Sequence, residues 1–250
     1  MNVHALMIRK LNLRRKLGDS ARDAIAATSL KVIDIEAGAC LVLDGAPPAP
    51  HCCLLLDGLA IRYKMTGAHN RQIVAVETPG DFLDLQHLFL TIADHSVEAL
   101  TPIQVAQIDR RTLRALALEH PAIGEALWTE ALIEASITRE WLANVGRRDG
   151  LARIAHLLCE LALRAEAVGI APDGTLILPL TQEQIGDITG MTAIHVNRML
   201  KALVASGLIA QSGRQLRILD RPGLVRAGDF NPRYLHLDDA DIVAKAANSN

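Results

Sequence analysis

The chain has 250 residues, of which 50% are hydrophobic, 22% charged and only 3% aromatic, and its 26 basic side chains nearly balance 28 acidic ones. This composition is typical of a soluble globular protein of one or two domains and excludes a disordered or fibrous chain. The strongest apolar run, Cys52 to Leu56, ends at Asp57 and is far shorter than the roughly 18 residues that a membrane-spanning helix needs. We therefore expect no transmembrane segment.

The N-terminal segment, Met1 to Leu17, mixes five basic residues with leucines and lacks the apolar centre and cleavage site of a secretory signal. We expect a helix that packs on the next domain, with its basic residues forming a solvated face; an arm that binds nucleic acid is the less favoured interpretation. Four cysteines in a chain of this length do not make a disulfide framework, so we expect a cytoplasmic protein.

Charge is uneven along the chain. Residues 1–146 carry 14 Lys and Arg against 17 Asp and Glu, residues 147–233 carry 11 against 8, and the last 17 residues carry 1 against 3. A positive excess confined to one segment is a weak indication of a polyanionic partner, because many solvated surfaces show the same imbalance.

Strand-length apolar runs, separated by glycines and prolines, dominate the first part of the chain. Their spacing of roughly 8 to 12 residues indicates a small antiparallel barrel or sandwich. The expected strands are Leu41 to Leu43, Cys52 to Leu56, Leu59 to Tyr63, Ile73 to Glu77, Ser96 to Leu100 and Ile103 to Ile108.

The period of the apolar residues changes from two to about 3.6 between Arg111 and Val145, and Pro121 suits the first turn of a helix. This helix is apolar on more than one side. A core helix of one domain would explain that, but we favour a subunit interface because a barrel covers only one side. The expected contacts of the homodimer are Leu127, Ile133, Ile137 and Trp141, and residues 146–150 are expected to form a hinge.

The last third of the chain predicts a winged helix-turn-helix. A helix over 151–168, a turn at 171–174 and a strand at 176–180 come first. Thr181 and Gln184 then fit the capping box of a short helix that ends at Gly190. Thr192 begins a second helix, with inward positions at Val196, Met199, Leu200 and Leu203, and strands at 208–211 and 215–219 complete the wing.

This motif predicts that the second helix enters the major groove of DNA while the first crosses the phosphates. Arg198 suits a guanine edge and Asn197 an adenine edge, whereas Lys201 suits a phosphate. The expected base-reading residues are Ala193, Ile194, His195, Asn197 and Arg198. The expected phosphate contacts are Thr181, Gln182, Thr192, Lys201, Ser212 and Arg214.

The sequences Leu180 to Gly186 and Thr192 to Arg198 resemble the DNA-binding domain of the cyclic-AMP receptor and fumarate-nitrate regulator (Crp/Fnr) family of bacterial transcription factors. The resemblance also covers Pro79-Gly80-Asp81-Phe82 and the glycines at 38, 45 and 58. It implies an α+β chain with a cyclic-nucleotide-binding-like β-roll sensor at 1–115, a dimerisation helix at 116–146, a winged helix-turn-helix at 147–221 and a C-terminal extension at 222–250. The implied partners are double-stranded DNA, a second copy of the chain and RNA polymerase.

The sequence departs from the family pattern at several positions. Ile194, His195 and Asn197 replace the usual Glu, Thr and small residue of the recognition helix, which resembles a subgroup with His-Val-Asn-Arg. In the sensor, Leu85 stands where members that bind cyclic AMP place a Glu, and His95-Ser96 stands for Arg-Ser. Without the arginine a cyclic phosphate loses its bidentate partner, so we expect an effector other than cyclic AMP, or none.

Other cofactors and functions are less favoured. Adjacent cysteines such as Cys52 and Cys53 point to opposite faces of a strand and are poor joint ligands of an iron–sulfur cluster. Lone histidines such as His51, His87 and His95 lack paired metal-ligand spacing, so neither metal nor haem is expected. The runner-up function is a ligand- or redox-sensing module with a vestigial DNA-binding half, against which Arg198 argues. No catalytic motif rises above chance, so an enzyme is a distant third.

Overall fold

The computed structural model describes residues 3–67, 70–169, 175–177, 179–213 and 215–237. The chain divides into two compact units. The N-terminal unit comprises Met1–Asn70 and Val74–Ala135, and the C-terminal unit comprises Arg71–Ile73 and Ser136–Asn250. Each is considered by itself. Within the described ranges, no helix has both the length and the apolar character that crossing a bilayer requires.

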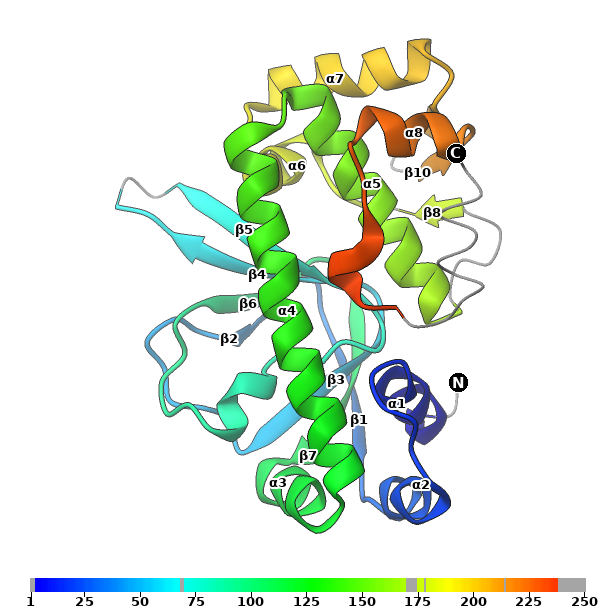
Figure 1. The fold of residues 1–250 in the computed structure, drawn as a ribbon. Coiled ribbons are helices and arrows are strands. Elements are labelled where there is room, and N and C mark those ends of the chain that lie inside the picture. Colours follow the sequence, from blue (N-terminus) through cyan, green and yellow to red (C-terminus); the bar gives the residue numbers. More distant parts are fainter. Residues whose placement is uncertain (1–2, 68–69, 170–174, 178, 214, 238–250) are drawn as a thin grey trace. The chain divides into compact units, whose positions relative to one another are not determined.

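The first seven strands form two antiparallel sheets (Figure 1). One has the order β1-β7-β3 and the other β2-β6-β4-β5. All six expected strands are present, and β1 is an additional one. The strands are β1 (Lys31–Ile35), β2 (Cys40–Val42), β3 (His51–Asp57), β4 (Ala60–Met65), β5 (Arg71–Glu77), β6 (Ser96–Ala99) and β7 (Ile103–Asp109). The strand-length apolar runs therefore predicted the β-rich domain correctly.

Helices cover the outer face of the β1-β7-β3 sheet. The expected N-terminal helix is two helices, α1 (Val3–Asn12) and α2 (Asp19–Ala26). Their buried apolar residues share one cluster with β3, with the 3₁₀ turn η1 (Leu85–Leu88), with α3 (Arg110–Glu119) and with the first turns of α4 (Pro121–Arg147). The expectation that the N-terminal segment packs on the sheet domain is confirmed.

The prediction of a solvated basic face on the N-terminal segment is wrong for Lys10 and Arg14. Lys10 is only 5% exposed, and its Nζ lies 2.7 Å from Asp81 Oδ1 and 2.8 Å from Glu130 Oε1. The Nε atom of Arg14 lies 2.6 Å from Glu130 Oε2. Burial alone would raise the pKa of Glu130, but the charges of Lys10 and Arg14 lower it. These cations tie the N-terminal helix to the sheet and to α4.

Helix α4 begins at Pro121, the residue that the sequence marked as its first turn, and runs to Arg147. It does not continue back to residue 116, because His120 separates it from α3. The break between helices expected at 146–150 is shorter than predicted, since Gly146 and Arg147 still belong to α4 and Gly150 already belongs to the next helix. Only Arg148 and Asp149 lie between α4 and the next helix, which Asp149 caps by accepting from the backbone N–H of Ala152.

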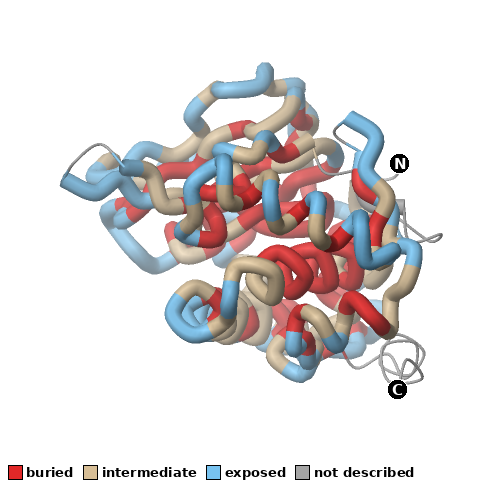
Figure 2. The backbone as a smooth tube through the Cα atoms, turned by 90° about the horizontal axis from the view of Figure 1, so that it is seen from above, coloured by how far each residue is buried: buried red, intermediate tan, exposed pale blue. Residues whose placement is uncertain are grey.

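The C-terminal unit is built on α5 (Gly150–Ala167), whose side chains are buried on most of its circumference, as the red segments of Figure 2 illustrate. Around it lie α6 (Gln182–Thr189), α7 (Ala193–Ala205), α8 (Arg221–Ala227), the 3₁₀ turn η2 (Pro232–Leu235) and a sheet of order β8-β10-β9. Its strands are β8 (Thr175–Ile177), β9 (Ile209–Ser212) and β10 (Gln215–Ile218). The expected turn at 171–174 lies outside the described residues.

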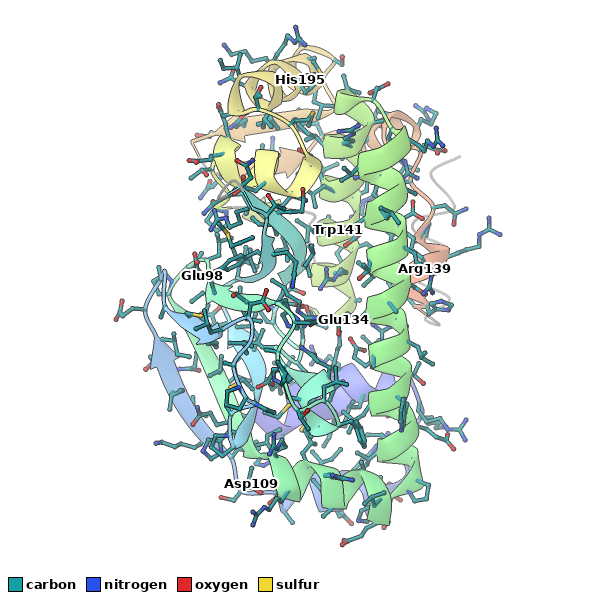
Figure 3. All side chains as sticks on the ribbon, turned by 90° about the vertical axis from the view of Figure 1, so that its left-hand side faces the viewer. Glu98, Asp109, Glu134, Arg139, Trp141 and His195 are labelled. Atoms are coloured by element: carbon teal, nitrogen blue, oxygen red, sulfur yellow. The ribbon has the colours of Figure 1, made fainter. Side chains whose placement is uncertain are left out.

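A buried acid organises the core of this unit. Glu160 on α5 is fully buried and accepts hydrogen bonds from Trp141 Nε1, at 2.9 and 3.1 Å, and from the Tyr234 hydroxyl at 2.7 Å. Burial raises the pKa of Glu160 despite the nearby Arg164. Figure 3 shows Trp141 on α4, the helix from which it reaches α5. Trp141 therefore packs within one chain, and the start of the C-terminal extension contributes Tyr234 to the same core.

Candidate nucleic-acid interface

The start of α6 is fixed by a reciprocal pair of hydrogen bonds, and two glycines shape the turn that follows it. The Thr181 hydroxyl accepts from the backbone N–H of Gln184 at 3.1 Å, and Gln184 Oε1 accepts from the N–H of Thr181 at 2.8 Å. Gly190 ends α6 with a φ of 68°, a conformation that glycine adopts at low cost. At Gly186 a Cβ would lie 2.4 Å from the carbonyl oxygen of Met191. The two helices thus meet in a close, defined turn.

Helix α7 buries one face and exposes the other. Val196, Leu200 and Leu203 are at most 2% exposed, as the spacing predicts, whereas Met199 is only half-buried. The Thr192 hydroxyl caps the helix by accepting from the N–H of His195 at 3.3 Å. Capped and packed in this way, α7 presents a rigid outer arc.

Four of the expected DNA contacts form that outer arc. Ala193, Ile194, Arg198 and Lys201 are all exposed, and the exposed fraction of Ile194 reaches 85%. Within the described residues, neither Arg198 nor Lys201 has an acidic partner. An exposed isoleucine and unpaired cations suit a duplex, since the cations meet phosphates or guanine edges and the isoleucine a thymine methyl.

Two expected base-reading residues are engaged elsewhere. The Nδ2 amide of Asn197, which is half-buried, donates to Gln182 Oε1 at 3.0 Å and so joins α7 to α6. His195, labelled in Figure 3, lies beside the start of α5, because a Cβ on Gly150 would be 2.9 Å from its Nε2 atom. Only part of the His195 and Asn197 side chains is therefore accessible.

The expected phosphate contacts occupy the ends of these elements. Thr181 and Thr192 are exposed caps, and Ser212 is exposed at the end of β9, whereas Arg214 lies outside the described residues. One exposed basic residue was missed: Arg217 on β10 alternates with the buried Leu216, and strand periodicity alone would have found it.

Another missed residue is Arg153, which joins α5 to the end of α6. Its Nη1 donates to the carbonyl oxygen of Thr189 at 2.9 Å, and its Nε donates to that of Arg148, also at 2.9 Å. An arginine inside a helical repeat gives no sequence signal for such a role. The contact fixes the C-terminal end of α6 relative to α5.

The interior of the sheet domain holds a buried ion-pair cluster. Arg62 on β4 is 7% exposed, and its Nη2 lies 3.1 Å from Glu77 Oε1 and 3.4 Å from the Leu83 carbonyl oxygen. Its Nη1 also pairs with Glu134 of α4, which Figure 3 labels. Two carboxylates around one guanidinium leave this cluster with a net negative charge.

The two positions that replace the family's nucleotide-binding residues offer no cation. Leu85 is 5% exposed in the apolar cluster. His95 Nδ1 lies 2.6 Å from Asp94 Oδ1, and its Nε2 lies 2.9 Å from the amide nitrogen of Gln86. That pattern suits a neutral imidazole which donates at Nδ1 and accepts at Nε2. Burial, followed by the charge of Arg62, lowers the pKa of His95.

The cysteines and histidines do not gather into a metal site within the described part of the chain, where no group of three or more suitable ligands is found. Cys52 is buried with its thiol 3.0 Å from Asp84 Oδ1. Burial raises the pKa of Cys53 to about 12. Both thiols are protonated at neutral pH and behave as small hydrophobic residues.

Two protein-family models match the chain. The model of a cyclic nucleotide-binding domain matches residues 32–120, and that of a Crp-like helix-turn-helix domain matches residues 152–227. The first covers the strands of the sheet domain. The second covers α6, α7 and the wing.

Known proteins match over most of the chain. The probable transcriptional regulator flp of Lacticaseibacillus casei is 30% identical over 210 residues, which are 83% of this chain and 91% of that protein. The transcriptional activator protein FnrL of Cereibacter sphaeroides is 29% identical over 164 residues, 64% of this chain and 65% of its own length. The solved structure of FixK2 from Bradyrhizobium japonicum is 24% identical with a TM-score of 0.72, covering 80% of this chain and 97% of that one. The chain belongs to the Crp/Fnr family of DNA-binding transcription regulators.

Proposed function

We propose that this regulator binds a palindromic operator as a homodimer, in response to an effector other than cyclic AMP or to none. The observation that carries the proposal is the exposed arc of α7, with Ile194, Arg198 and Lys201 on a helix held by caps at both ends of the turn. One such helix reads only a few base pairs. A two-fold axis adds a second half-site about one helical turn away, roughly 34 Å.

The dimer contacts that the sequence suggested need revision. Leu127, Ile133 and Trp141 are at most 7% exposed in a single chain and Ile137 is half-buried, so their packing is already satisfied. A different face of α4 is open. Its exposed residues are Trp128, Leu132, Ala135, Arg139 and Leu142.

This open face has the spacing of a helix-pairing seam, because successive members are four, three, four and three residues apart. Trp128 is 60% exposed, Leu132 64% and Leu142 75%. Large apolar side chains so exposed, in one row, are what a symmetric partner helix would bury. We therefore assign the dimer interface to this row, with Arg139 as its charged member.

The Arg62 cluster supports an effector other than cyclic AMP. A cyclic phosphate keeps its negative charge, and burying it without a partner costs several kcal/mol. Here Arg62 is the buried cation near His95, and Glu77 and Glu134 already neutralise it. A phosphate would have to displace two carboxylates that repel it.

The sequence from His195 to Arg198 also supports a subgroup distinct from members that carry Glu and Thr in the recognition helix. Ile194 stands at the position of that Glu and cannot accept a hydrogen bond from cytosine. RNA polymerase is the expected protein partner at the promoter. That assignment rests on the family alone.

The proposal is tested by selecting duplexes bound by the full chain from a random pool. The expected product is an inverted repeat with half-sites one helical turn apart. Arg198→Ala should weaken binding to the selected site by about 1 to 3 kcal/mol and relax the preference for one guanine. Lys201→Ala should instead weaken binding to all duplexes alike. Half-sites without symmetry, or an unchanged preference in Arg198→Ala, would contradict the proposed reading of DNA.

A further inference from the structure

A cavity lies at the start of α3, and the DNA-binding function does not use it. It encloses about 330 Å³, and the residues around it include Arg110, Arg111 and Arg114 together with His87 and Phe89. Its volume falls at the lower end of the range for sites that bind small organic molecules. Its lining includes neither Arg62 nor Leu85, so it is separate from the cluster inside the sheet domain.

Three guanidinium groups meet at this cavity. Arg110 donates one long hydrogen bond, 3.5 Å, to the carbonyl oxygen of His87, and the guanidinium carbon of Arg114 lies 5.5 Å from the centre of the Phe89 ring. In the described part of the chain, none of the three forms an ion pair. The nearest acid along the chain, Asp109, is occupied in capping α3, where it accepts from the backbone N–H and hydroxyl of Thr112.

The fourth polar group at the cavity is His87. It is 4% exposed, and both of its ring nitrogens lack a hydrogen-bond partner among the described residues. Burial, opposed by Asp84, lowers the pKa of this imidazole. A buried polar group without a partner costs free energy, so His87 adds an unsatisfied polar group beside the three arginines.

The remaining wall is apolar and includes an aromatic ring. Phe89 is 54% exposed, and its ring already offers one face to Arg114 and stacks at 5.5 Å on Trp128. Leu88 and Leu90 continue this wall. The cavity thus combines a strongly cationic side with a surface for a flat or apolar body.

We propose that this cavity binds a small organic anion, in which a phosphoryl or carboxylate group meets Arg110, Arg111 and Arg114 while an apolar body lies against the wall formed by Leu88, Phe89 and Leu90. Guanidinium groups pair bidentately with both kinds of oxyanion. The inference goes beyond the proposed function, which names no ligand class. Ligand binding can be measured in the absence of DNA, so the two proposals are tested separately.

Calorimetry of the full chain tests the site with two organic anions, phenyl phosphate and benzoate. Inorganic phosphate, which lacks the apolar body, and phenol, which lacks the phosphoryl or carboxylate group, serve as the comparison probes. We expect at least one organic anion to bind about tenfold or more tightly than either comparison probe. Its arrival should change the fluorescence of Trp128, which stacks on Phe89. Preference between the two anions identifies the oxyanion.

The variant Arg111→Ala/Arg114→Ala removes two exposed side chains and should lower the affinity for the organic anion at least tenfold. A matched control, Arg22→Ala/Lys31→Ala, removes the same charge from exposed positions elsewhere and should leave the affinity unchanged. Equal loss in both variants would reduce the effect to net charge and overturn the site. Failure of both organic anions to bind the wild-type chain more tightly than inorganic phosphate would also overturn it.

Discussion

Replacing Leu132 with Glu is the sharpest test of the dimer seam on α4. The Leu132 side chain is 64% exposed in one chain. Its burial by a partner would therefore contribute roughly two thirds of the 1.5 to 3 kcal/mol that a fully buried leucine provides. Two-fold symmetry doubles that to about 2 to 4 kcal/mol, and two desolvated carboxylates add several more. A loss of about 6 kcal/mol raises the dimer dissociation constant by more than 10⁴.

Sedimentation velocity at micromolar concentration measures the outcome, and circular dichroism checks that the fold is kept. Leu118→Glu is the matched control, because Leu118 is 74% exposed on α3 and lies outside the seam. Ile133→Ala should instead lower the free energy of unfolding by about 2 to 5 kcal/mol, since Ile133 is 3% exposed. A dimeric Leu132→Glu variant that still binds DNA tightly would refute the seam.

Four further outcomes are expected. Lys10→Met should lower the free energy of unfolding in urea by about 3 to 5 kcal/mol, because it leaves Asp81 and Glu130 buried beside one cation fewer. The folded-state pKa of Glu130 is lowered, so its contribution is present above its ordinary pKa and is lost as pH falls through the lowered one. Urea titrations of the wild-type chain across acidic pH should show this loss, and a flat profile would contradict it. Asn197→Ala should lower the free energy of unfolding by about 1 kcal/mol. Adding Gln182→Ala should lower it little further, because both substitutions remove the same hydrogen bond. Full additivity in a double-mutant cycle would speak against that bond. Calorimetry with cyclic AMP should give no binding tighter than about 10 μM, and tighter binding would mean that Arg62 exchanges its carboxylates for the phosphate.

The elements that sequence patterns predicted well are those whose signals are local. Caps and turn glycines act within four residues of themselves, so Thr181, Thr192 and Gly190 mark the ends of α6 and α7 through the residue types alone. Alternation along the strands gave the sheets for the same reason. Residues 193, 194, 198 and 201 followed directly from helical geometry, and all four are exposed.

The features that the sequence did not predict depend on contacts between distant segments. Helix α4 is apolar on two faces, and nothing in its own sequence tells whether Ile133 or Leu132 is the buried residue. Asn197 looked like a free base-reader because its partner, Gln182, lies on another helix. Lys10 looked solvated because Asp81, 71 positions further along the chain, is the residue that neutralises it.

The same long-range pairing bears on where a signal enters this regulator. Arg62 and Glu134 join a strand of the sheet domain to α4 without any ligand, and breaking such a buried pair costs about 3 to 5 kcal/mol. A molecule that entered the sheet domain at this point would have to supply that free energy and neutralise two carboxylates as well. An anion at Arg110, Arg111 and Arg114 faces no such opposition, because those cations have no acidic partner among the described residues. Its contact with Phe89 reaches Trp128, the first residue of the proposed seam, so binding there can alter pairing of α4 while the Arg62 cluster stays intact.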